Sequence, residues 1–318
     1  MRSGLSRFRH WRMPGVVLLL AVWLTGCATP TRALLSGSAN HLPPRTELAA
    51  TPFFPQERYQ CGPAALAMSL TSAGIDVTPE ILKPQVYVPQ REGSLQPEML
   101  AAARRHGAVA MTIPPSLDAL LAELAAGHPV LVLQNLSLAW MPLWHYAVAI
   151  GYDLERDEII LRSGTTERLA MPLPTFDKTW ERGKRWGMVA LPPGRLPVTV
   201  GESAVVEALM TFEKTSEAAP ARQAYAAALQ RWPRNLALQL GMGNTAYAAG
   251  DRRAAAAAFR EATQTHPDNA PAFINLATVL LELGEVKQAR QAAEHALALG
   301  GTWRETAAST LQVIAGRE

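Results

Sequence analysis

Small residues and helix terminators recur at a fixed interval of 34 residues in the C-terminal part of this chain. Pro233 and Pro267 are one interval apart, and so are Gly250 and Gly284. Two series of alanines follow the same step: Ala221, Ala255 and Ala289, and Ala228, Ala262 and Ala296. A repeat of this length predicts stacked helical units, because one such unit cannot bury its apolar face alone.

The period and the small residues resemble the tetratricopeptide repeat, a helix–turn–helix unit. The resemblance covers about residues 201–301 and implies an all-α repeat domain over 201–318 that binds a protein partner. The match departs at Ala246, where an aromatic residue is common, and at Gly301, where a proline is common. Thr302 and Glu305 form a capping box that predicts a closing helix to about residue 315. An alanine-rich bundle without repeat geometry is the alternative.

The N-terminus has the pattern of a signal peptide. An apolar stretch over residues 16–24 is too short to span a bilayer, and four basic residues precede it: Arg2, Arg7, Arg9 and Arg12. Small residues then lead to Cys27, which resembles the lipid-attachment cysteine of bacterial lipoproteins. The resemblance implies a signal peptide over 1–26 and, because Ala28 follows, an outer-membrane anchor facing the periplasm. A plain secretory signal is the alternative.

Removal of residues 1–26 changes the charge of the chain. The formal charge of the whole sequence is +3, but the four arginines of this segment have no acidic counterpart, so the remainder carries −1. A nearly neutral protein gives no electrostatic basis for nucleic-acid binding. We expect a tether over 27–50 and a first folded domain over 51–193. The histidines show no pair at zinc-ligand spacing, so we predict no metal and no cofactor.

Helical and strand signals alternate through the first domain. Ser116 is the predicted N-cap of a helix ended by Gly127, and Ser94 that of a helix ended by Gly107. The predicted helices cover 63–73, 94–106 and 117–126, and the predicted strands cover 108–113, 129–134, 145–152, 158–161 and 186–191. Helices followed by a mostly antiparallel sheet indicate an α+β fold.

Two segments carry residue types that suit thiol chemistry. Cys61 lies in Gln-Cys-Gly-Pro-Ala-Ala at the predicted start of a helix, where free N–H groups and the helix dipole favour a thiolate. If Cys27 is acylated, the other cysteine has no intrachain partner. His145 opens an apolar strand and is the candidate base. The alternatives are an inert buried thiol and a strand histidine that is satisfied by its neighbours.

The two segments resemble the papain-like, bacteriocin-processing cysteine peptidase family over about residues 52–191. The resemblance implies a papain-like peptidase domain of the α+β class, with Cys61 as nucleophile, His145 as base and a peptide or protein as substrate. In that family a glutamine shortly before the cysteine helps to form the oxyanion hole. Gln56 is the better match, five residues ahead rather than the usual six, and Gln60 is its rival.

The third catalytic position departs from the family, which places Asp or Asn on the strand after the histidine strand. Here that strand ends in Leu-Arg-Ser-Gly at 161–164. Asp153 lies eight residues from His145, which is about 26 Å along a strand, and is therefore excluded together with Asp157. A hairpin instead brings Ser163 beside His145. A serine can hydrogen-bond an imidazole but does not stabilise imidazolium as a carboxylate does.

These features together predict a lipid-anchored cysteine peptidase of the cell envelope whose repeats recruit a protein substrate or partner. One alternative is a catalytically degenerate, peptide-binding scaffold. Another is acyl transfer or amide hydrolysis on the same fold, which needs the same thiolate and oxyanion hole. We expect Trp140 and Trp144 to cover the sheet edge or pack under a loop, the alternative being that they line a substrate cleft.

Overall fold

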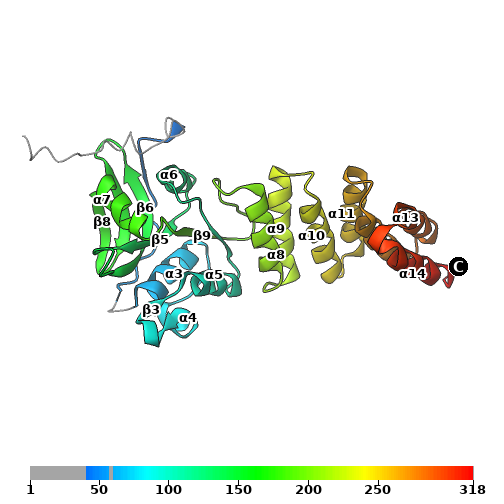
Figure 1. Cartoon of the computed structure of the whole chain (residues 1–318), viewed down its shortest axis with the longest axis horizontal. Helices are drawn as coiled ribbons and strands as arrows, with labels where there is room; N and C mark the ends of the chain where they lie inside the picture. The colour runs from blue at the N-terminus through cyan, green and yellow to red at the C-terminus, as the bar shows by residue number, and fades with distance from the viewer. Residues whose placement is uncertain (1–40, 57–59, 318) are drawn as a thin grey trace, which may run out of the picture.

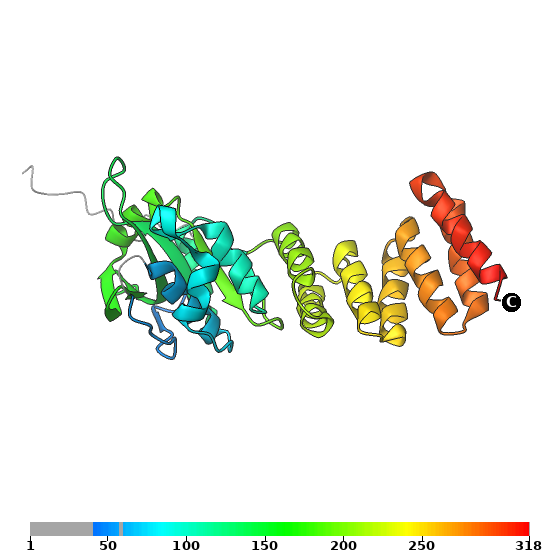
Figure 2. The ribbon, with the colours of Figure 1, turned by 90° about the horizontal axis from the view of Figure 1, so that it is seen from below.

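The computed structural model describes residues 41–56 and 60–317, so the predicted signal peptide and Cys27 lie outside the described residues. An α+β domain is followed by a row of helices that extends away from it to the C-terminus, as Figure 1 and Figure 2 show from two directions. The predicted order of an α+β domain and an all-α repeat region is confirmed.

In the described part of the chain, a seven-stranded antiparallel sheet forms the centre of the first domain. Its order is β4-β9-β5-β6-β7-β8, and β1 pairs with the far end of β6. A separate ribbon consists of β2 and β3. The strands are β1 (Arg45–Glu47), β2 (Tyr87–Val88), β3 (Gly93–Ser94), β4 (Val109–Thr112), β5 (Val130–Asn135), β6 (Trp144–Asp153), β7 (Glu158–Ser163), β8 (Thr166–Pro172) and β9 (Gly187–Leu191).

Helices cover both faces of this sheet (Figure 1). Side chains alternate along a strand, so Tyr146 and Val148 of β6 enter one apolar cluster while Ala147 and Ala149 enter the other. Each face therefore needs its own cover of helices. The first face is covered by α3 (Cys61–Ser72), with α4 (Pro79–Val86) and α5 (Gln96–Arg105), and the second by α6 (Leu117–Ala125) and α7 (Leu173–Arg182).

The predicted helix ends are partly right. Ser116 Oγ accepts a hydrogen bond of 3.2 Å from the Ala119 N–H and caps α6 as expected. Gly107 and Gly127 both follow their helices with positive φ. Ser94 is not an N-cap: α5 begins at Gln96 without a side-chain cap among the described residues. The reason is that Ser94 belongs to β3, where it pairs with β2.

The prediction of a tether over 27–50 is wrong for its last residues. β1 (Arg45–Glu47) pairs with residues 151–153 of β6, the longest strand of the sheet. The buried guanidinium of Arg162 then donates to the carbonyl oxygens of Ala49 at 3.0 Å and Thr51 at 2.8 Å. A buried cation needs such acceptors, so this segment is part of the folded domain.

The repeat helices reproduce the period of the sequence. The first helices of successive units are α8 (Glu202–Glu213), α10 (Leu236–Ala248), α12 (Ala270–Glu282) and α14 (Arg304–Ala315), and the second helices are α9 (Ala218–Arg231), α11 (Arg252–Thr265) and α13 (Val286–Leu299). Within each series the helices begin 34 residues apart. The repeat geometry and the closing helix α14 are therefore confirmed.

The start of the closing helix differs from the prediction. A 3₁₀ turn, η3 (Gly301–Trp303), precedes α14, and Gly300 and Gly301 have positive φ. Within residues 60–317, no side chain caps α14, whose N-cap is Trp303. The capping box of Thr302 and Glu305 is therefore not formed, because the chain has already turned at the two glycines.

The first repeat helix is packed on the sheet domain. Leu209 and Phe212 of α8 share an apolar cluster with Val109 and Met111 of β4, the edge strand of the sheet. This contact joins the first repeat helix to one face of the sheet at its β4 end. Separately, no helix in the described ranges is both long and apolar enough to cross a membrane.

Candidate active site

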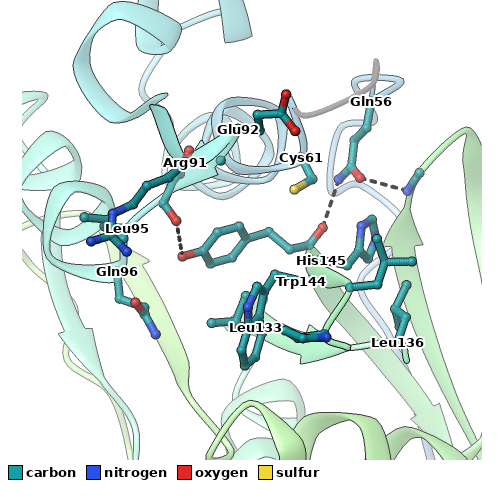
Figure 3. Close-up of a pocket in the computed structure, with 16 residues that line it drawn as sticks. Gln56, Cys61, Arg91, Glu92, Leu95, Gln96, Leu133, Leu136, Trp144 and His145 are labelled. Carbon is teal, nitrogen blue, oxygen red and sulfur yellow. Dashed lines mark hydrogen bonds between the residues drawn. The ribbon is translucent and has the colours of Figure 1, made fainter. Parts of the chain in front are cut away.

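Cys61, His145 and Gln56 line one cleft of about 810 Å³. Figure 3 shows the Cys61 sulfur, the Gln56 amide and the His145 ring around the same part of this cleft. One side of the cleft is formed by residues 91–96, which include β3, and the other by the loop between β5 and β6. The cleft therefore lies where the N-terminus of α3 meets the start of β6.

The local sequence explains how Cys61 reaches the cleft. α3 begins at Cys61 itself, and the residues from Gly62 to Leu70 are all buried. A Cβ on Gly62 would overlap the Ser94 side chain, so only glycine allows β3 to approach the helix start. Pro63 fits the first turn, where its missing N–H has no helical partner. The thiol is thus held at a buried helix N-terminus.

The second member of the site, His145, is held by β7. The strands β6 and β7 form a hairpin, and His145 Nε2 lies 2.8 Å from Ser163 Oγ. Ser163 therefore occupies the position beside the imidazole. Asp153 lies at the other end of β6, where its Oδ1 accepts hydrogen bonds from the N–H groups of Glu155 and Arg156 in the hairpin turn.

Gln56 is fixed by three hydrogen bonds. Its Nε2 donates to the carbonyl of Tyr146 at 3.2 Å, and its Oε1 accepts from the Gly164 N–H at 3.0 Å. Its backbone N–H donates to the Gly164 carbonyl at 3.0 Å. The amide nitrogen carries a second hydrogen that these bonds do not use. Of the two candidate glutamines, Gln56 is among the described residues that line the cleft. Gln60, the N-cap residue of α3, is not among them.

Burial controls the charge of both reactive groups. It raises the pKa of the Cys61 thiol, although hydrogen bonds from the backbone N–H groups of Tyr146, Gly62 and Cys61 act in the opposite direction. Burial also lowers the pKa of His145. Both shifts favour the neutral forms of the two groups over a thiolate–imidazolium pair. In the described part of the chain, no hydrogen bond joins the thiol to the imidazole.

Tyr146 links the two sides of the cleft. Its hydroxyl donates to the Ser94 carbonyl at 3.1 Å, and its ring packs edge-to-face on Trp186. Burial raises the pKa of this phenol, so it remains a neutral donor. The sequence gives no sign of this role, because the tyrosine reads as an ordinary strand residue beside His145.

The two tryptophans do not pack under a loop, and the alternative of a cleft-lining position holds for Trp144. Trp140 is 77% exposed and Trp144 is 52% exposed, and Trp144 lines the cleft. The loop that carries Trp140 lies beyond Asn135 and Trp144, the last paired residues of β5 and β6. Leu136 and Leu143, on the same loop, also line the cleft and were missed. The signal that could have found them is the uncharged segment 136–144 before the histidine strand.

The described residues contain no cluster of three or more His, Cys, Asp or Glu side chains that could hold a metal ion. The cleft itself supplies a thiol, an imidazole and an amide group. Such a set can form and break an acyl–sulfur bond, provided that the imidazole takes the thiol proton.

Comparison with known proteins divides the chain in the same way. The Peptidase_C39 like family matches residues 48–187, and the tetratricopeptide repeat family matches residues 246–308. A search of curated proteins finds no match.

Among solved structures, a Bacillus anthracis protein described as a C39-like peptidase is 19% identical, with 46% of this chain and 97% of that chain covered and a TM-score of 0.40. The Yersinia enterocolitica type III secretion chaperone SycD, in complex with a peptide of the translocator YopD, is 16% identical over 36% of this chain and 92% of that chain, with a TM-score of 0.34. The Sgt2 repeat domain of Aspergillus fumigatus is 19% identical over 36% and 78%, also with a TM-score of 0.34.

Proposed function

We propose that this protein is a lipid-anchored cysteine peptidase of the bacterial cell envelope. The proposal starts from a Peptidase_C39-like domain that is followed by tetratricopeptide repeats. The observation that carries the proposal is the shared cleft, in which Cys61, His145 and Gln56 meet and the imidazole is already oriented by Ser163. A thiol, a base and an oxyanion donor are the three groups that peptide-bond cleavage by a cysteine requires.

The proposed reaction begins from the neutral pair. His145 Nε2 lies 2.8 Å from Ser163 Oγ, and the proposal assigns the tautomer in which Nε2–H donates to this hydroxyl and Nδ1 is the basic nitrogen. As the Cys61 sulfur forms a bond to the peptide carbonyl carbon, the thiol proton passes to Nδ1. Neutral Cys61 and His145 thus become a bound sulfur and an imidazolium in one step, without a resting thiolate.

The carbonyl oxygen becomes an oxyanion in that step. The second hydrogen of Gln56 Nε2 and the backbone N–H of Cys61 are the proposed donors, and one such donor contributes about 3 kcal/mol in related sites. The imidazolium of His145 then protonates the amine as the carbon–nitrogen bond breaks, leaving a thioester on Cys61. Water, deprotonated by His145, hydrolyses the thioester and restores the thiol.

The other parts of the proposal concern location and recruitment. Acylation of Cys27 anchors the protein in the outer membrane, facing the periplasm, and the segment after Cys27 links the anchor to the folded domain. The repeats recruit a protein substrate or partner, since stacked helical repeats form extended concave binding surfaces. Replacing Cys27 by Ala should move the full chain from the membrane fraction to the soluble fraction and remove the mass of the acyl chains.

The test of the peptidase proposal uses a mixture of unfolded proteins as substrate. The full chain and its Cys61→Ala variant are incubated with the mixture, and new peptide termini are identified by mass spectrometry. The proposal predicts cleavage products only with the unmodified chain. The absence of such products from both samples contradicts peptidase activity, and amide products with added amines in place of hydrolysed termini indicate acyl transfer.

A second candidate function is peptide binding without cleavage. Two observations favour it: a serine stands where the family has a carboxylate or amide, and burial favours the neutral forms of both Cys61 and His145. This candidate predicts that Cys61→Ala preserves the function of the protein in the cell. The peptidase predicts that the same variant loses it.

A further inference from the structure

An uncharged loop beside the cleft exposes an unusual amount of apolar surface. The loop consists of residues 136–143 between β5 and β6, and together with Trp144, the first residue of β6, it is called the apolar loop below. Six of its large side chains are between 44% and 77% exposed: Leu136, Leu138, Trp140, Met141, Leu143 and Trp144. These are half of the exposed large apolar side chains in the described part of the chain. Surface of this kind marks an interaction site.

The apolar loop is held in place by its backbone. Buried Asn135 accepts hydrogen bonds through Oδ1 from the N–H groups of Ser137 at 3.0 Å and Leu143 at 2.9 Å. The Leu136 N–H donates to the Leu143 carbonyl at 2.9 Å, and Arg182 of α7 donates to the Ser137 carbonyl at 2.8 Å. The apolar side chains are therefore displayed on a fixed scaffold, which lowers the cost of ordering them when something binds.

The apolar loop is continuous with the candidate active site. Leu136, Leu143 and Trp144 line the same cleft as Cys61 and His145, and Figure 3 shows Leu136 and Trp144 beside His145. The opposite side of the cleft carries polar groups, including Arg91, Glu92 and Gln96. Whatever covers these three apolar side chains therefore lies within reach of the thiol.

We infer that the apolar loop binds bulky apolar side chains of an extended peptide, next to the bond that Cys61 attacks; this inference rests on the proposed function. Leucine, phenylalanine and methionine residues of the peptide would bury apolar surface on Leu136, Leu143 and Trp144. A membrane surface would contact the outer residues of the loop, but it would not enter the cleft. The two sides of the cleft differ in polarity, so the preference applies to the side of the peptide that faces the apolar loop.

The test measures how fast peptidyl acyloxymethyl ketones modify Cys61 in the full chain, by mass spectrometry of the labelled peptide. Two probes share one reactive group and differ only in carrying Leu-Leu or Ser-Ser in the two residues before it. Each rate is divided by the iodoacetamide rate of the same variant, which reports the thiol alone. We expect the Leu-Leu probe to react about tenfold faster with the unmodified chain.

Two variants locate the preference. The double substitution Leu136→Gln and Leu143→Gln should reduce the ratio between the probes to about one, because both side chains line the cleft. Met210→Gln is the matched control, since Met210 is 49% exposed on α8, outside the cleft, and should leave the ratio unchanged.

The outcomes separate this inference from the proposed function. Equal rates for both probes in the unmodified chain overturn the inference, while labelling at Cys61 still supports the peptidase. Labelling of Cys61 by iodoacetamide but by neither peptidyl probe overturns both.

A membrane role for the apolar loop gives a third, distinct result. Flotation with phosphatidylcholine–phosphatidylglycerol vesicles is measured for the Cys27→Ala chain, which carries no lipid anchor. The result that indicates lipid contact has three parts: the protein floats, Trp140→Gln abolishes flotation, and the Leu136→Gln and Leu143→Gln double variant keeps the ratio between the probes. In that case the apolar loop binds lipid and the peptide inference is wrong.

Discussion

The repeat helices and the cleft are built in opposite ways. Each repeat helix begins 34 residues after its counterpart, and its burial is spread over many small side chains. The cleft instead brings Gln56, Cys61, His145 and Ser163 together from four separate segments. In the repeats, many similar contacts each contribute a little to stability. In the cleft, the proposed chemistry depends on a few atoms. Substitutions should affect the two regions in correspondingly different ways.

The largest expected effect is that of Cys61→Ala, which removes the nucleophile. Peptide cleavage and thiol labelling should be lost completely, while the urea midpoint of unfolding stays close to that of the unmodified chain, since alanine fits a helix start. Cleavage that survives this substitution would place the chemistry outside the cleft.

The next effect is expected for Gln56→Glu. The new carboxylate keeps an acceptor for the Gly164 N–H but removes both hydrogens of Nε2, so the proposed oxyanion donor is lost. Peptide cleavage should slow by about 100-fold. Gln60→Glu is the matched control, because Gln60 does not line the described cleft, and should have a much smaller effect. Equal losses in the two variants would contradict the role of Gln56.

In the repeats, a comparable change should alter stability alone. A Cβ on Gly241 would overlap the ring of Tyr225, so Gly241→Ala should lower the free energy of unfolding by about 1–3 kcal/mol. Urea unfolding measures the loss. Peptidyl-probe labelling of the remaining folded protein should be unchanged, and a parallel loss of labelling would show that the two regions are coupled.

Ser163→Asp should increase the rate of peptide cleavage rather than reduce it. A carboxylate beside His145 Nε2 stabilises imidazolium, which the neutral Ser163 hydroxyl does not do. We expect peptide cleavage to become about tenfold faster, because one pKa unit corresponds to a tenfold change in the proton-transfer equilibrium. Ser163→Ala should slow it. Faster cleavage by the alanine variant would exclude Ser163 as the orienting group.

The smallest effect concerns pH and stability. Burial lowers the pKa of His145 below its usual 6.5, so the unfolded chain binds this proton more readily than the folded chain. The stability that depends on neutral His145 is present above pH 6.5 and is lost as the pH falls below it. Between pH 7.5 and 5.5, His145→Gln should therefore lose less stability than the unmodified chain in urea titrations. An equal loss in both would mean that His145 is not desolvated.

The sequence predicts the repeats best because their signal is local. The spacing of small residues sets both helix starts and crossings, without knowledge of distant contacts. The placement of Ser163 beside His145 also follows from local reasoning, since it needs only the length of the β6–β7 hairpin.

Other features depend on contacts between distant segments and were not predicted. α4 and α7 are short and contain prolines, and β8 is an edge strand whose first residues are polar and exposed. The raised pKa of Cys61 follows from packing of the whole domain around the thiol, which no motif records. The exposure of the apolar loop likewise depends on what the fold leaves uncovered.

The central claim is that His145 takes the proton of Cys61 when a peptide binds. Its most direct test is the rate at which the Leu-Leu acyloxymethyl ketone labels Cys61 between pH 5 and pH 10, in the unmodified chain and in His145→Gln. The account predicts labelling at pH 7.5 that is at least about 100-fold faster in the unmodified chain, as expected for a positioned base. Two superimposable curves that both follow the thiol titration alone would contradict it.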